Sequence, residues 1–217
     1  MTDWLEIFKS KEIENAIGEI VESYHNKFIF QTYHLEKIPE YPSFVLVLAG
    51  SELIMGVVIS LSIKPIVPIS DIPKPFKRKR EDFAKEYRDI MDKYRAVCEA
   101  VTVGYIRGNE IYQGRPEKIP LIHDLVFLPE KEIIREIHLN KEPSLKYLPL
   151  IYNAMPNEER SLFGYFLESF FKRLKEIFSK EELIDILNGM QKDLLENQFD
   201  HLAEQVNISL GRLLKYE

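Results

Sequence analysis

Residues 44–63 read FVLVLAGSELIMGVVISLSI, and this stretch decides the fold class. Two runs rich in β-branched and aliphatic residues, which favour β-strands, lie on either side of the turn-forming pair Gly50-Ser51. Both runs are apolar at consecutive positions instead of alternating with polar residues. Such strands must be covered on both faces or belong to a sheet that closes on itself, which also removes exposed edges. We therefore predict a β-barrel built around this hairpin.

Two further β-rich runs precede the hairpin. They read IGEIVES at 17–23 and KFIFQTY at 27–33, and turn-forming residues follow them at 25–26 and 40–42. Short strands separated by turns in this way are typical of an antiparallel meander. The runs therefore extend the predicted sheet toward the N-terminus.

The first 16 residues have a different pattern. Trp4, Leu5, Phe8 and Ile13 follow roughly helical spacing, and Asp3 is in a position to cap a helix. We expect a short leading helix over residues 1–16, before the barrel.

Four prolines between residues 64 and 75 predict an irregular excursion, because proline lacks a donor and restricts the residue before it. Apolar positions at helical spacing then predict an inserted helix over residues 76–96. Strand character returns at 97–106, and shorter runs follow at 110–113 and 125–128. These runs would close the barrel, which we place at residues 17–142.

Residues 143–217 are predicted to be a helical tail. The stretch from Glu158 to Phe178 has apolar residues at i, i+3, i+4 and i+7 almost throughout. Ser179 and Glu182 match a capping box, which begins the next helix. The predicted fold class is α+β: a small antiparallel β-barrel with an inserted helix, followed by a C-terminal helical region.

Composition limits the possible functions. The chain has 217 residues, a formal net charge of −6 and a pI near 5.5, so as a whole it does not attract phosphate backbones or anionic membranes. Its single cysteine, Cys98, cannot form an internal disulfide. The first residues do not resemble a signal peptide, and no window approaches the ~18 apolar residues of a membrane span. We expect a cytoplasmic protein that does not enter membranes.

The segment from Ile17 to Ile137 resembles the HAS-barrel, the small β-barrel that precedes the motor domain in HerA-type ATPases and in ATP synthase subunits. IGEIVES and SFVLVLA carry part of the resemblance, and the most specific part reads VTVGYIRGNEIYQGRPEKIPLIHDLVFLPEKEI at 101–133. There, the strand end Gly104-Tyr105 precedes the turn Arg115-Pro116, a second proline and a strand that leads into an acidic helix start.

The sequence departs from HerA-type enzymes where their catalysis resides. Those enzymes continue into a motor domain with a phosphate-binding loop of the form G-x-x-x-x-G-K-[ST], and none of the nine glycines here begins such a loop. The resemblance therefore implies no ATPase activity for this chain. It implies a docking and ring-forming module, since the barrel of HerA contacts the partner nuclease NurA.

The basic run Lys77-Arg78-Lys79-Arg80 is one candidate contact with a partner or with nucleic acid. Clustered cations gain affinity for DNA by releasing condensed counterions. Glu81 and Asp82 follow at once, however, and favour a solvated helix start whose charges are partly neutralised. DNA contact is the minority hypothesis.

Arg107 and Arg115 are a second candidate contact, because they flank a glycine-containing hairpin at one end of the predicted barrel. They could reach a partner or a phosphate. The alternative is that they keep the turn soluble and pair locally with Glu110 or Glu117.

No cofactor and no metal are expected. The five histidines lack the spacing of a zinc site, and adjacent His123 and Asp124 would point to opposite faces of a strand. Carboxylates are abundant, but none forms a convincing cluster with lysine at a strand end. Cys98 lies in a β-run, where we expect it to be buried and inert.

The tail offers a candidate interface between copies of the chain. Phe163, Phe166, Phe170, Phe171, Leu174 and Phe178 form a wide apolar helix face. Packing against the barrel is the favoured interpretation, and dimerisation through this face is the alternative.

Together these patterns predict a protein that is not an enzyme but a protein-interaction or assembly module, linked to DNA-processing machinery by its HAS-barrel resemblance. The first alternative is a nucleic-acid-binding protein that uses the basic excursion. The second is an uncharacterised nuclease or hydrolase.

Overall fold

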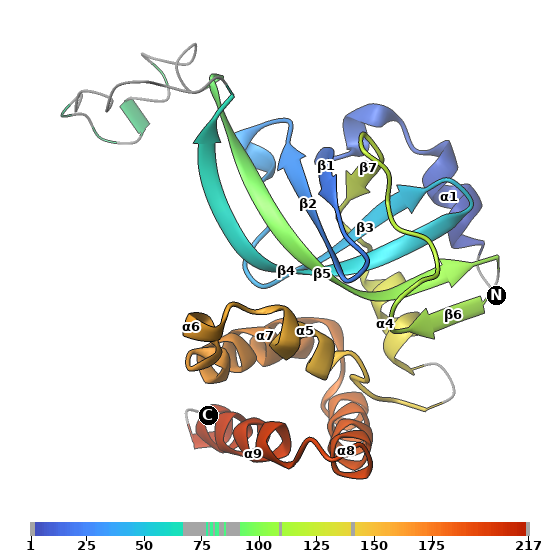
Figure 1. The fold of residues 1–217 in the computed structure, drawn as a ribbon, viewed down its shortest axis with the longest axis vertical. Coiled ribbons are helices and arrows are strands. Elements are labelled where there is room, and N and C mark those ends of the chain that lie inside the picture. The colour runs from blue at the N-terminus through green and yellow to red at the C-terminus, as the bar shows by residue number, and fades with distance from the viewer. Residues whose placement is uncertain are drawn as a thin grey trace.

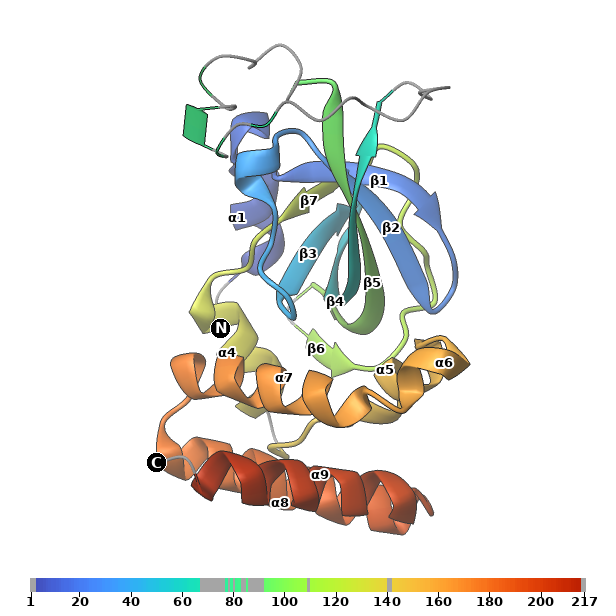
Figure 2. The same cartoon turned by 90° about the vertical axis from the view of Figure 1, so that its left-hand side faces the viewer.

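Six antiparallel strands close into a β-barrel, and helices of the C-terminal half pack against one side of it (Figures 1 and 2). The computed structural model describes residues 3–66, 77, 79, 81–82, 85, 92–108, 110–139 and 142–215. The strands are β1 (Gly18–Ser23), β2 (Lys27–Thr32), β3 (Phe44–Ala49), β4 (Glu52–Pro65), β5 (Tyr94–Arg107), β6 (Glu110–Gln113) and β7 (Leu125–Phe127). The α-helices are α1 (Trp4–Ser10), α4 (Lys131–Leu139), α5 (Leu148–Ala154), α6 (Asn157–Arg160), α7 (Phe163–Ile177), α8 (Lys180–Glu196) and α9 (Asp200–Lys215).

The strand order around the barrel is β2-β1-β7-β3-β4-β5, and β2 closes it by pairing with β5. In this closing seam Phe30 lies opposite Cys98. β6 pairs with β5 alone and extends the sheet beyond the closed part. The predicted fold class, a small antiparallel barrel followed by a helical region, is confirmed.

Side chains fill the barrel. The interior cluster consists of buried residues from every strand of the closed sheet and from its approach: Ile17, Ile20, Phe28, Phe30, Val45, Val47, Ile54, Val58, Ala96, Cys98, Ala100 and Val126. Gly56 leaves room for one of the rings, because a Cβ added there would lie 2.5 Å from Cζ of Phe28. The interior is therefore a packed core.

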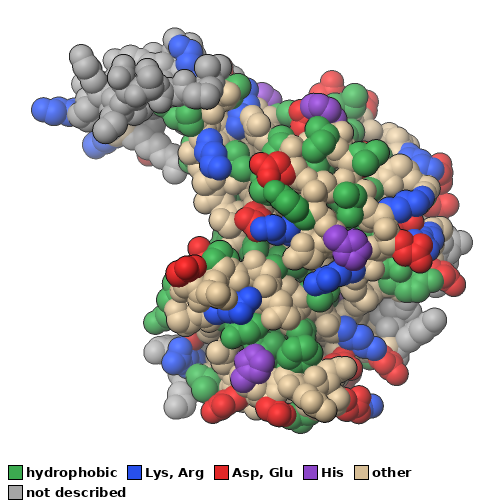
Figure 3. Space-filling model, viewed as in Figure 1, with side chains coloured by type: hydrophobic (Ala, Val, Ile, Leu, Met, Phe, Trp, Pro, Cys, Tyr) green, Lys and Arg blue, Asp and Glu red, His purple; other side chains and the backbone are tan. Residues whose placement is uncertain are grey.

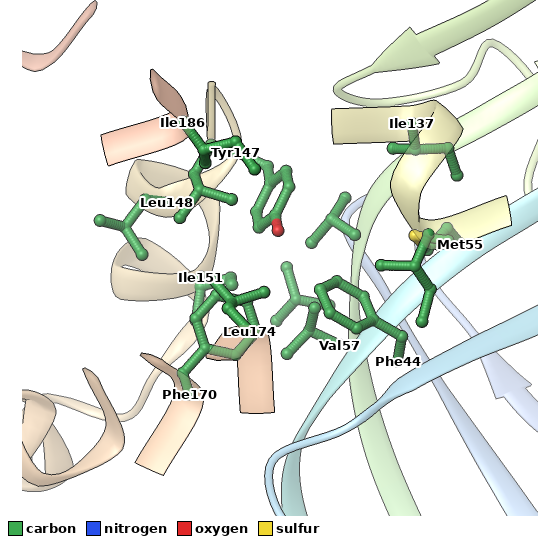
Figure 4. Packing of buried hydrophobic residues seen from close by; sticks show 14 of the residues in the cluster. Phe44, Met55, Val57, Ile137, Tyr147, Leu148, Ile151, Phe170, Leu174 and Ile186 are labelled. Carbon is green, nitrogen blue, oxygen red and sulfur yellow. The ribbon is translucent and has the colours of Figure 1, made fainter. Parts of the chain in front are cut away.

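The opposite face of the same strands is also buried, under the helices. Phe44 on β3 and Met55 and Val57 on β4 belong to a second cluster that includes Phe170 and Leu174 on α7 (Figure 4). This arrangement explains why the stretch at 44–63 is apolar at consecutive positions. Its strands are both closed into a barrel and covered from outside.

The excursion differs from its prediction at both ends. β4 continues to Pro65, which pairs with Tyr94 at the start of β5, so residues 94–96 are strand and not the end of a helix. Pro65 is tolerated because it is the last residue of its strand, where a missing donor breaks little of the ladder. Glu81, Asp82 and Lys85 are helical. The remainder of the helix expected over 76–96 lies largely outside the described residues.

The predicted helix ends are mostly confirmed, with two added breaks. Asp3 caps α1, although this leading helix is shorter than expected, and Ser179 and Glu182 form the capping box of α8. The helix expected from Glu158 to Phe178 is divided into α6 and α7. Gln198, at a φ of 62°, separates α8 from α9.

Among the described helices, none has the length and apolar content that crossing a bilayer requires.

Candidate functional site at the barrel mouth

One end of the barrel brings together both arginines that the sequence singled out near the hairpin. We define the barrel mouth as the β1–β2 turn (23–27), the β3–β4 turn (49–52), the described residues of the β5–β6 hairpin (104–108 and 110–113) and the loop that follows it (114–124). β2 and β6 share one edge of β5, because Asn26 O accepts from Thr102 N and Gly114 N donates to Val103 O. These pairings place the turns and the hairpin at the same end (Figure 1).

The loop at 114–124 is held to the rest of the mouth at several points. Glu117 forms an ion pair with Arg107, at 3.3 Å. The amide of Leu121 donates to the Asp124 carboxylate at 2.7 Å, and burial raises the pKa of that carboxyl. His123 has a left-handed backbone, with a φ of 72°, and its amide donates to the carbonyl of Ile20. The loop therefore bridges β6 and the β1–β7 side of the barrel.

A row of charged residues crosses three strands at the mouth. Glu52 on β4, Arg107 on β5 and Glu110 on β6 occupy directly opposite register positions. Nε of Arg107 donates to Oε1 of Glu52 at 2.8 Å, and this bond is the main reason that the pKa of the guanidinium is raised. The Glu52 side chain is only 2% exposed, and its Oε2 has no hydrogen-bond partner within the described structure. A buried carboxylate thus keeps one unused acceptor.

An aromatic row lies beside the charged one. Tyr105 and Tyr112 stack with their ring centroids 4.9 Å apart and an interplanar angle of 17°. The Arg107 guanidinium lies 5.5 Å from the Tyr105 ring centroid, close enough for a cation–π contact. The Tyr112 hydroxyl donates to the Glu110 carboxylate, which raises the pKa of the phenol. The two rows form one continuous polar and aromatic surface.

Apolar side chains are exposed at the same end. Leu121 is 68% exposed and Ile122 is 51% exposed, and Ile119 precedes them on the same loop. Tyr24 on the β1–β2 turn and Tyr112 on β6 are also exposed. Tyrosine, arginine and aliphatic side chains together are the usual composition of the centre of a protein interface.

Arg107 and Arg115 have different surroundings. Arg107 is held by carboxylates, as the alternative interpretation expected, but its main partner is Glu52 and not Glu110. Arg115 is exposed, and its side chain makes no ion pair with any described residue. Because Glu52 and Glu117 already neutralise the charge of Arg107, this arginine is poorly suited to bind a phosphate.

The basic run at 77–80 is only partly described. Lys77 and Lys79 are exposed, whereas Arg78 and Arg80 lie outside the described residues. On the face shown in Figure 3, basic and acidic side chains are interspersed over the barrel and the tail. The run stays a prediction.

The apolar helix face that the sequence offered as an interface is buried within the chain. All of its residues are buried within the chain, none more than 5% exposed: Phe163, Phe166, Phe170, Phe171, Leu174 and Phe178. Phe170, for example, packs with its ring centroid 5.5 Å from that of Phe44 on β3 (Figure 4). The barrel and the neighbouring helices α4, α5, α8 and α9 together cover this face.

The remaining candidates from the sequence are structural. Cys98 is buried inside the barrel, as expected, and burial raises its thiol pKa to about 12, so it is not a reactive thiolate. Within the described part of the chain, no group of three or more His, Cys, Asp or Glu side chains is placed to hold a metal.

A hollow of about 400 Å³ lies between residues 142–144 and α8. Three of its polar lining residues have partners: Ser144 donates to Asp193, and Glu142 pairs with Lys146 at 2.9 Å. None of the buried side-chain atoms that lack a hydrogen-bond partner in the described structure belongs to its lining.

Sequence reasoning missed Glu52, the key residue of the mouth. The available signal was a carboxylate between a Gly-Ser turn and a strongly apolar strand, where burial requires a cationic partner. Comparison with models of known protein families gave no match, and neither did comparison with curated proteins.

Proposed function

We propose that this protein is a non-catalytic docking module that binds a protein partner through the barrel mouth. The observation that carries the proposal is the exposed apolar loop at the mouth, in which Leu121 and Ile122 are more than half exposed. Exposed apolar groups of this kind cost free energy in water and are retained at binding surfaces. Side chains fill the barrel interior, which favours binding at an external surface and not binding of a ligand inside the barrel.

Two features favour protein as the partner. The mouth combines aliphatic, tyrosine and arginine side chains, which dominate binding energy in protein interfaces. The loop is also tied down at Arg107, Ile20 and Asp124, so a partner would not have to order it first. A pre-organised loop is a suitable docking element.

The HAS-barrel resemblance supports a more specific partner. Its most specific part, residues 101–133, contains most of the barrel mouth. In HerA-type enzymes the corresponding barrel is a docking module. We therefore propose that the partner belongs to DNA-processing machinery and is a HerA-type motor or an associated nuclease.

The experiment compares two matched double variants. Leu121→Ser with Ile122→Ser removes exposed apolar groups at the mouth, and Leu195→Ser with Ile208→Ser removes similarly exposed groups from the tail. Each tagged protein is used to capture partners from its own cell extract, with quantification by mass spectrometry. Binding of the purified HerA-type ATPase of the same organism is then measured by light scattering.

The mouth variant is expected to lose the partner by about tenfold or more, since each buried aliphatic side chain contributes about 1.5–3 kcal/mol. The tail variant should capture as much as the unchanged protein. Equal capture by all three proteins would refute docking through the mouth.

Nucleic-acid binding is the second candidate function, and the charge distribution favours it. Residues 61–96 contain ten Lys and Arg against six Asp and Glu, a net charge of +4 in a chain of −6. Lys64, Lys77, Lys79 and Lys93 are exposed within this range. The test is the salt dependence of binding to labelled single-stranded and duplex DNA. A steep loss with salt that is weakened by neutralising the run at 77–80 would support it. Magnesium-dependent cleavage of the same DNA would instead support the nuclease alternative.

A further inference from the structure

We infer that the barrel mouth receives a cationic side chain, arginine or lysine, from a basic segment of the partner protein. Glu117 and Glu110 would pair with this side chain, and Arg107 would move fully onto Glu52. The inference rests on the proposed docking function and adds the chemistry of the partner.

The charges in contact at the mouth are mostly negative. Arg107 is the cation of the cluster, and three carboxylates surround it or its neighbour Tyr112: Glu52, Glu110 and Glu117. The carboxylates that raise the pKa of the Arg107 guanidinium are Glu52, through its hydrogen bond, and Glu117. This contacting cluster therefore has a negative excess, which attracts a cation, whereas Arg115 and Lys118 carry positive charge on the same loop outside it.

The buried oxygen of Glu52 is the second, independent observation. Glu52 is 1% exposed, and its Oε2 has no hydrogen-bond partner among the described residues, whereas its Oε1 accepts from Arg107 at 2.8 Å. Arginine normally satisfies both oxygens of a carboxylate with its two parallel N–H groups. Here the Arg107 guanidinium bonds to two different carboxylates, because its Nη2 lies 3.3 Å from Glu117 on the loop while its Nε bonds to Glu52.

Because Arg107 pairs with two carboxylates, a cation from the partner protein can replace it at one of them. A cation from the partner can take over the exposed carboxylate of Glu117, whose side chain is 81% exposed. The released N–H of Arg107 can then donate to Oε2 of Glu52, which completes a two-point ion pair. The partner thereby satisfies a buried acceptor that it does not itself touch, since burial makes an unpaired acceptor costly.

The aromatic row adds a surface for the same cation. Tyr112 is exposed, stacks on Tyr105 and holds Glu110 through its hydroxyl. A guanidinium or ammonium over this ring would gain a cation–π contact next to a carboxylate. Arginine and lysine side chains from a protein fit this combination, whereas the phosphates of a nucleic acid do not.

The test uses fluorescently labelled hexa-arginine and hexa-glutamate peptides as probes. The full chain is added at low ionic strength, and the fluorescence anisotropy of each peptide measures its binding. Glu110→Gln with Glu117→Gln removes two carboxylates from the mouth. Glu158→Gln with Glu159→Gln removes two exposed carboxylates from α6 and is the control of equal net charge. Thermal unfolding confirms that each variant is folded.

We expect hexa-arginine to bind the unchanged protein and the α6 variant alike, and to bind the mouth variant about tenfold more weakly. Arg107→Lys should also weaken binding severalfold although it keeps the charge, because lysine cannot pair with both oxygens of Glu52. An equal loss in both Gln variants, or preferential binding of hexa-glutamate, would overturn the inference. Unchanged affinity in Arg107→Lys would overturn the exchange.

The results separate this inference from the proposed function. One outcome is that partner capture depends on Leu121 and Ile122 while both double Gln variants bind hexa-arginine with the same affinity. In that case docking through the mouth is supported, and a cationic ligand at the mouth is refuted. If capture is independent of the loop, the docking function itself fails.

Discussion

The hydroxyl of Tyr147 lies 2.6 Å from Nε2 of His138, and neither side chain is exposed to solvent. The other ring nitrogen, Nδ1, lies 2.6 Å from the carbonyl of Ile134. Because a carbonyl can only accept, Nδ1 carries the proton and Nε2 accepts from the tyrosine. This contact joins α4, the helix after the barrel, to the residue that precedes α5 in the tail.

Replacing Tyr147 with phenylalanine should destabilise the protein. The change leaves Nε2 of His138 buried without a donor, which costs about 1–3 kcal/mol. Urea unfolding followed by circular dichroism measures the loss. Tyr165→Phe is the control, because this tyrosine is 65% exposed and its hydroxyl should contribute less than about 0.5 kcal/mol. Equal stability of the two variants would contradict the role of the hydrogen bond.

Stability should fall on mild acidification because of His138. Burial lowers the pKa of its imidazole from the ordinary value of 6.5 to about 4. The unfolded chain therefore binds a proton below pH 6.5 that the folded chain does not, so this contribution is complete above that pH and is lost as pH falls toward 4. The expected loss is about 1 kcal/mol between about pH 7.5 and about pH 5.5. Urea unfolding at both pH values should show a smaller difference in His138→Gln.

Gly56→Ala should destabilise the barrel interior. The added Cβ would lie 2.5 Å from Cζ of Phe28, and overpacking of this kind costs about 1–3 kcal/mol. Combining the change with Phe28→Leu, which removes the obstructing ring, should recover part of the loss in thermal unfolding. Gly211→Ala on α9 is the control, since nothing lies within 4 Å of its added Cβ. That change should stabilise the protein slightly, and a similar loss at both glycines would be inconsistent with steric overlap.

Barrel and tail should unfold together. Phe170 on α7 belongs to the same buried cluster as Trp4 on α1, which lies on the outer face of the barrel. Phe170→Ala should cost about 3–5 kcal/mol, and the only tryptophan should report the shift although it is far away in sequence. Trp4 fluorescence and circular dichroism are expected to give one transition. Two separate transitions would show that the tail is an independent unit.

Much of the fold was predictable because its signals are local. The hairpin at 44–63, the capping box at Ser179 and the apolar face of α7 all depend on residues a few positions apart. The errors occurred where a distant partner decided the conformation. Tyr94 follows a helical spacing but pairs with Pro65, and this pairing makes it strand.

The candidate site was predictable only in part. The hairpin and its arginines are visible in the sequence, and their position at one end of the barrel follows from the strand order. The partner of Arg107 is not visible, because Glu52 lies 55 residues away and reaches it only through the pairing of β4 with β5. The exposed loop at 119–122 reads like any other apolar run until its burial is known.

The sequence by itself determined which segments are strands and helices and that the strands need cover on both sides, because propensity and periodicity act over neighbouring residues. Only the tertiary structure decided what provides that cover. The phenylalanines of α7 are buried against the barrel and the neighbouring helices of their own chain, and a carboxylate at the start of β4 becomes buried beside an arginine at the end of β5. Both outcomes depend on contacts between distant segments, which chain closure and side-chain packing select and local pattern does not encode.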